Sequence, residues 1–126
     1  MINIEKQTEY WITTAEDDLV TAEILMTKKR LLHSLFFCHL TIEKAIKAHF
    51  VKQTGEYAPK SHNLFFLNEK AMLNFSEDEY VFLGILMKYQ LEGRYPDYNP
   101  DVPSIETVQN YIQQTKQLFE WLKKTL

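Results

Sequence analysis

Residues 31–54 read Leu31-Leu32-His33-Ser34-Leu35-Phe36-Phe37-Cys38-His39-Leu40-Thr41-Ile42-Glu43-Lys44-Ala45-Ile46-Lys47-Ala48-His49-Phe50-Val51-Lys52-Gln53-Thr54. The first half of this stretch is apolar nearly all round, which is typical of a helix covered by several neighbours. No glycine or proline interrupts it, and Gly55 follows at a position where helices commonly end. We therefore predict a central helix over 31–54, around which the rest of the chain packs.

Helices are predicted on both sides of the central one. Apolar residues at steps of three and four predict a helix over about 5–27. A short helix is expected over roughly 63–73, where three apolar side chains would pack inward. Ser76 and Glu79 have the spacing of a capping box, which predicts the start of a helix that continues to about Leu91.

A last helix begins near Ser104, because apolar residues keep three-four spacing from there to the C-terminus. No alternating pattern predicts a strand. The predicted fold class is therefore all-α, a compact up-and-down bundle of four to five helices. At 126 residues the chain suits a single domain over 1–126.

Composition narrows the range of functions. The net charge is −3, so the chain lacks the global positive field that drives non-specific binding to nucleic acid. A single cysteine forms no intrachain disulfide, and residues 1–6 lack the basic start and apolar run of a signal peptide. The most apolar stretch, 31–42, is too short to span a membrane. We expect a cytoplasmic protein without a membrane segment.

The four histidines and Cys38 could suggest a metal site, but their spacing argues against one. Cys38 and His39 are adjacent, so on a helix they point about 100° apart. We expect His39 to be a buried, hydrogen-bonded histidine and Cys38 to fill space in the core. No metal or other cofactor is predicted.

Glu43 and Lys47 lie at i and i+4 on the central helix, in the favourable order for an ion pair. The simpler interpretation is a solvated salt bridge. The alternative is a charged edge that faces a polar groove between helices and supports a binding site.

Two polar loops interrupt the helices. Lys60-Ser61-His62-Asn63 stands where a loop enters the third helix, and backbone N–H groups at a helix start favour anions. Lys60 and His62 could therefore seat a phosphate, while Ser61 or Asn63 caps the helix.

The second loop contains Arg94-Tyr95-Pro96-Asp97-Tyr98. Arg94 supplies a bidentate fork for phosphate, and Tyr95 and Tyr98 offer stacking faces for a base. The alternative is that Arg94 only pairs with Asp97 and that Tyr95 packs on the last helix.

Four segments resemble the HEPN family ("higher eukaryotes and prokaryotes nucleotide-binding" domain). They are Ala15-Glu16-Asp17-Asp18-Leu19-x-x-Ala22, the Glu43-Lys44-Ala45-x-Lys47 signature, Pro59-Lys60-Ser61-His62-Asn63-Leu64, and Arg94-Tyr95-Pro96-Asp97. The resemblance implies a helical bundle that commonly dimerises and often pairs with a minimal nucleotidyltransferase, frequently as a toxin–antitoxin system.

Many HEPN proteins are metal-independent ribonucleases with an Arg-x(4–6)-His motif near the end of the fourth helix. This chain departs from that pattern, because its last histidine is His62 and none follows Arg94. The leading hypothesis is thus a non-catalytic HEPN-type homodimer that binds a nucleotide or RNA phosphate through Lys60, His62 and Arg94. The alternatives are a ribonuclease that uses Arg94 with His62, and a purely structural protein-interaction module.

Overall fold

A computed structural model of the chain describes residues 2–91, 96 and 100–126. Within these residues the regular secondary structure is helical. The helices are α1 (Ile4–Thr27), α2 (Leu31–Thr54), α3 (Leu64–Ala71), α4 (Glu77–Met87) and α5 (Ile105–Lys124). The prediction of an all-α bundle is confirmed, and α4 ends four residues before the predicted limit at Leu91.

The helix ends follow from local chemistry. The side chain of Ser76 accepts a hydrogen bond from the N–H of Glu79, and the Glu79 carboxylate accepts from the N–H of Ser76, so the capping box forms as predicted. Gly55 ends α2 with φ +70°, in the left-handed region that glycine adopts without a steric penalty. Ser104 caps α5 through the N–H of Thr107.

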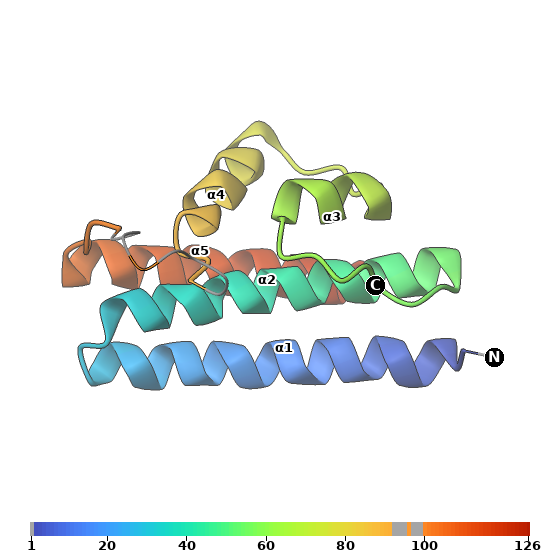
Figure 1. Ribbon diagram of the computed structural model, residues 1–126, viewed down its shortest axis with the longest axis horizontal. Coiled ribbons are helices and arrows are strands. Elements are labelled where there is room, and N and C mark those ends of the chain that lie inside the picture. Colours follow the sequence, from blue (N-terminus) through green and yellow to red (C-terminus); the bar gives the residue numbers. More distant parts are fainter. Residues whose placement is uncertain (1, 92–95, 97–99) are drawn as a thin grey trace.

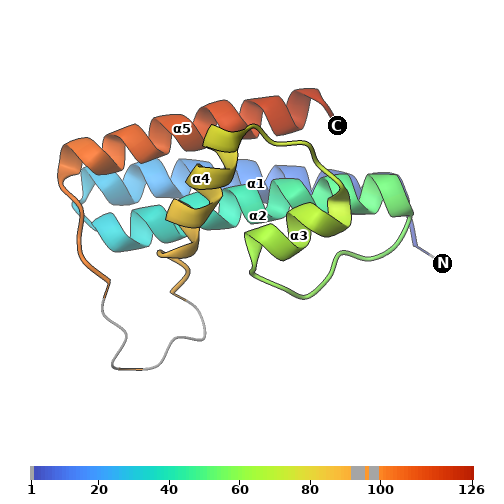
Figure 2. The same cartoon turned by 90° about the horizontal axis from the view of Figure 1, so that it is seen from above.

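The helices form three layers. Figure 1 shows α1 along one side, α2 and α5 in the middle, and α3 and α4 across the other side of α2 and α5. The view from above in Figure 2 shows the long helices α1, α2 and α5 running along the same axis, while α3 and α4 lie beside one another over them. The chain between α2 and α3 runs along α2, and this segment carries His62.

Small side chains allow α1 and α2 to pack closely. Ala15 and Ala22 on α1 are fully buried, as are Ala45 and Ala48 on α2. Ser34, at the start of α2, donates a hydrogen bond of 2.7 Å from its Oγ to the carbonyl oxygen of Ala22. The close approach of α1 and α2 allows polar side chains of the two helices to meet, as Asp18 of α1 does with Lys44 of α2.

The C-terminal helix is tied to α2 by a buried histidine. The Nε2–H of His49 donates to the carbonyl oxygen of Leu122 over 2.7 Å. Phe119 and Leu122 are buried in the core beside it. Burial lowers the pKa of His49 below its ordinary value of 6.5, and the hydrogen bond to Leu122 opposes that shift only in part. His49 is therefore a neutral structural side chain.

Candidate functional site

A buried carboxylate lies at the centre of the candidate site. Glu43 is 2% exposed and Lys47 is 5% exposed, and the Lys47 ammonium lies 3.1 Å from Oε2 of Glu43. The interpretation of this pair as a solvated salt bridge was therefore wrong. The reason is tertiary: α1 covers one side of this turn of α2, and the chain before α3 covers another. Two charges removed from water in this way need compensating partners.

His62 is the second partner of the buried carboxylate. Its Nδ1 lies 3.0 Å from Oε1 of Glu43, while its side chain remains 46% exposed. Because an ionised carboxylate can only accept, Nδ1 carries a proton and donates a hydrogen bond to Glu43. In the neutral ring the lone pair then belongs to Nε2. Glu43 thus sets both the tautomer and the orientation of a histidine at the surface.

His39 holds the backbone of the same loop. It is fully buried, and its Nε2–H donates to the carbonyl oxygen of His62 over 3.0 Å. Its Nδ1 lies 3.7 Å from Oε1 of Glu43. The prediction of a buried, hydrogen-bonded histidine is confirmed. Through His39 and Glu43, α2 positions both the main chain and the side chain of His62.

The start of α3 is capped rather than open to an anion. The Asn63 side chain accepts from the N–H groups of Phe65 and Phe66, over 3.0 and 3.1 Å. The prediction that Asn63 caps this helix is confirmed. It also means that the N–H groups of Phe65 and Phe66 already have an acceptor, which disfavours a phosphate-binding site built from the backbone N–H groups at the start of α3. A phosphate in this loop would have to be held by side chains, of which Lys60 and His62 are exposed.

Helix α1 contributes side chains that the sequence reasoning did not assign to the site. Lys47 lies with its Nζ 5.1 Å from the centre of the Trp11 ring, a cation–π contact. Asp18 pairs with Lys44 over 2.7 Å and is largely buried. Trp11 and Asp18 are seven residues apart and so share one face of α1. An aspartate on the buried face of an amphipathic helix was the signal that could have revealed them.

Cys38 is unsuited to nucleophilic catalysis. It is fully buried, and loss of solvation raises the pKa of its thiol to about 12, although a hydrogen bond with Thr115 acts in the opposite direction. The expectation that Cys38 fills space in the core agrees with this position. Among the described residues, no group of three or more histidine, cysteine, aspartate or glutamate side chains is arranged to hold a metal ion.

The second predicted loop falls almost entirely outside the described residues. Arg94, Tyr95, Asp97 and Tyr98 lie outside the described residues. Their roles, and the expected meeting of Arg94 with His62, stay predictions. Leu91, just before that loop, lines a shallow apolar pocket with His33, Phe36 and Leu40.

The chemistry of the described site follows from its charges. One buried carboxylate is shared by an ammonium and an imidazole, and only the imidazole reaches solvent to a large extent. Such an arrangement can present an oriented Nε2 to a ligand. When the ring is protonated it donates a hydrogen bond, and when it is neutral it accepts one.

Comparison with known proteins agrees with the helical architecture. No helix within the described residues is long and apolar enough to cross a membrane. The chain resembles the crystal structure of the protein TT1696 from Thermus thermophilus, with a TM-score of 0.79 and 19% identity over 95% of this chain and 98% of that one. At this identity the likeness shows the fold. None of the curated proteins compared with the chain matches it.

The family is shown by the sequence model of the HEPN domain, which matches residues 8–125. This range includes Trp11, Asp18, Glu43, Lys47 and His62, so the whole described site lies within the matched region. The chain therefore belongs to the HEPN domain family.

Proposed function

We propose that this HEPN domain binds a nucleotide or an RNA phosphate at the loop before α3, through His62 and Lys60. The observation that carries the proposal is the contact of 3.0 Å between His62 Nδ1 and the buried Glu43. Holding a carboxylate in the interior is costly, and here it orients an imidazole at the surface. Lys60, two residues earlier and exposed, adds a mobile positive charge for the same anion.

Arg94 completes the proposed site. Its guanidinium would hold a second edge of the phosphate, and Tyr95 or Tyr98 would lie against the base. Asp97 would keep Arg94 in place when no ligand is bound. The hypothesis requires the 59–63 and 92–98 loops to share one pocket.

Isothermal titration of ATP, GTP and short RNAs tests this site. We expect His62→Gln and Arg94→Ala each to weaken binding about tenfold or more, because each removes a charge-assisted contact to phosphate. Lys60→Gln should have a smaller effect. Lys70→Gln is the matched control, since Lys70 is an exposed lysine on α3 whose Nζ lies over the Phe66 ring. Unchanged affinity in both the His62 and Arg94 variants, or no binding by the unmodified protein, would refute the site.

A second candidate function is metal-independent cleavage of RNA. The observation in its favour is again the Glu43–His62 contact, because a carboxylate that fixes the tautomer of a histidine is a common device for general acid–base catalysis. Arg94 would stabilise the phosphorane, and His62 would move the proton of the 2′-hydroxyl. Incubation with tRNA in the presence of EDTA should then give fragments, and His62→Ala should abolish them. Intact tRNA would leave binding as the function.

The assembly is proposed on the basis of the family. We infer a homodimer that pairs with a minimal nucleotidyltransferase in a toxin–antitoxin-like system. Light scattering of the purified protein tests the dimer, and co-purification from the native host tests the partner. A monomer that elutes with neither a nucleotidyltransferase nor RNA would favour the remaining alternative, a protein-interaction module whose polar loops are only structural.

A further inference from the structure

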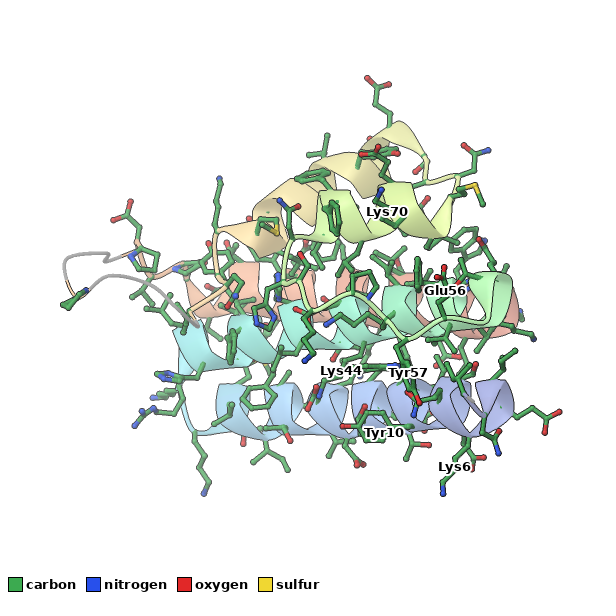
Figure 3. All side chains as sticks on the ribbon, turned by 45° about the vertical axis from the view of Figure 1, so that its right-hand side comes forward. Lys6, Tyr10, Lys44, Glu56, Tyr57 and Lys70 are labelled. Carbon is green, nitrogen blue, oxygen red and sulfur yellow. The ribbon has the colours of Figure 1, made fainter. Side chains whose placement is uncertain are left out.

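Two tyrosines are exposed on the face that α1 and the loop after α2 present together. Tyr10 on α1 is 55% exposed and Tyr57 in the loop is 65% exposed. Figure 3 shows Tyr10, Lys44 and Tyr57 on this one face, although they come from three separate segments of the chain. We call Tyr10 and Tyr57 the aromatic shelf.

Direct contacts connect Tyr10 with His62. The Tyr10 ring packs edge-on against Trp11, with their centres 5.1 Å apart. The Lys47 ammonium lies over the Trp11 ring, 5.1 Å from its centre. The same ammonium donates a hydrogen bond to Oε2 of Glu43 over 3.1 Å. Glu43 in turn binds His62 over 3.0 Å. Tyr10 is therefore linked to His62 through Trp11 and the buried side chains of Lys47 and Glu43.

Tyr57 is held along the same face by the two ends of its loop. A methyl group added at Gly55 would lie 3.3 Å from Cδ1 of Ile4, so the loop starts against the beginning of α1. It ends at His62, which is fixed to Glu43 on α2. Tyr57 lies between these two anchors, and the five residues from Tyr57 to His62 span at most about 17 Å.

The lysines near the aromatic shelf are paired with carboxylates, which favours binding of an uncharged base over binding of a phosphate. Lys44 is neutralised by Asp18 over 2.7 Å, and Lys47 by Glu43 over 3.1 Å. Figure 3 also labels Lys6 and Glu56, whose charges are opposite. An uncharged base gains from stacking on exposed aromatic rings and needs no cation there.

We propose that the aromatic shelf stacks a base of single-stranded RNA whose neighbouring phosphate lies at His62 and Lys60. This inference rests on the proposed phosphate site and deepens it, because the ligand becomes an oligonucleotide rather than a mononucleotide.

Tryptophan fluorescence gives a direct measurement. The chain has two tryptophans, so Trp121→Phe leaves Trp11, which contacts Tyr10, as the only reporter. This variant would be titrated with penta-adenylate RNA, with an abasic strand carrying the same number of phosphates, and with AMP. Strands with 2′-O-methyl groups prevent cleavage should the protein be a ribonuclease. Far-ultraviolet circular dichroism would check that each variant folds.

We expect penta-adenylate to quench Trp11 and to bind about tenfold more tightly than either the abasic strand or AMP. Tyr57→Ser should lower its affinity to that of the abasic strand, whereas Tyr57→Phe, which keeps the ring, should not. Phe66→Ser is the matched control, because Phe66 is a 40% exposed ring on α3, away from the shelf.

Two results would overturn the proposal in distinguishable ways. Equal affinity for penta-adenylate and the abasic strand, with both weakened by His62→Gln, would keep the phosphate site and exclude the shelf. No binding of any of the three probes would exclude both.

Discussion

Burial changes the meaning of the pair formed by Glu43 and Lys47. At the surface such a pair contributes little to stability, because water screens both charges. In this fold each side chain retains only a few per cent of its exposure, so removal of Lys47 leaves the buried Glu43 carboxylate without its ammonium partner and with the His62 imidazole alone from that pairing. The pair is therefore part of the structural support for His62.

Replacing Lys47 with methionine should destabilise the protein by about 3–5 kcal/mol, because the Glu43 carboxylate loses its ammonium partner in the interior. The free energy of unfolding can be measured with urea and circular dichroism. Lys116→Met is the matched control, since Lys116 pairs with Glu23 over 3.3 Å at the surface, and it should cost less than about 1 kcal/mol. Similar losses in the two variants would mean that the Glu43–Lys47 pair behaves as a solvated one.

At the scale of the element, local sequence and structure agree closely for the helices. The three-four apolar spacing, the Ser76–Glu79 capping box and Gly55 are interactions within a few residues, so they could be recognised before the fold was known. The end of α4 was predicted less well. The α-helix ends at Met87, yet Tyr89 and Gln90 beyond it are still buried, and their N–H groups bond to the carbonyl oxygens of Leu86 and Met87 in turns of the i to i+3 kind.

The Ser76 cap gives a prediction for α4. Ser76→Ala should destabilise the protein by about 1 kcal/mol, because the N–H of Glu79 loses its acceptor and the reciprocal bond is weakened. Ser76→Asp keeps an acceptor at this position and should retain most of the stability. Hydrogen exchange would report faster exchange in the first turn of α4 for the alanine variant only. Equal protection in both variants would show that packing, and not the cap, holds this helix end.

At the scale of the whole molecule, His49 couples folding to pH. Its pKa is lowered in the folded state, so the unfolded chain takes up a proton first as the pH falls below about 6.5. The unfolded state then binds more protons than the folded one, and stability must decrease on acidification from 6.5 toward the lower pKa of the folded state. Well above this pH both states are neutral at this position and His49 adds no pH dependence.

His49→Gln tests this coupling, because glutamine can donate to the Leu122 carbonyl and does not titrate. Thermal melts about one pH unit above and one below the ordinary histidine pKa should show a smaller loss of stability for the variant than for the unmodified protein. His33→Gln, at an exposed position on α2, is the control and should behave like the unmodified protein. A variant with an unchanged pH dependence would assign the acid sensitivity to other groups.

The sequence by itself determined the helices and the caps at Gly55, Asn63, Ser76 and Ser104, because these depend on periodicity and on contacts between near neighbours. It also pointed to His62 and to the pair of Glu43 and Lys47. Only the tertiary structure decided that the pair is buried, that it orients His62, and that Trp11 belongs to the same group. Burial is set by what packs against α2 from α1 and from the chain before α3, and the i, i+4 spacing of Glu43 and Lys47 carries no information about these distant segments.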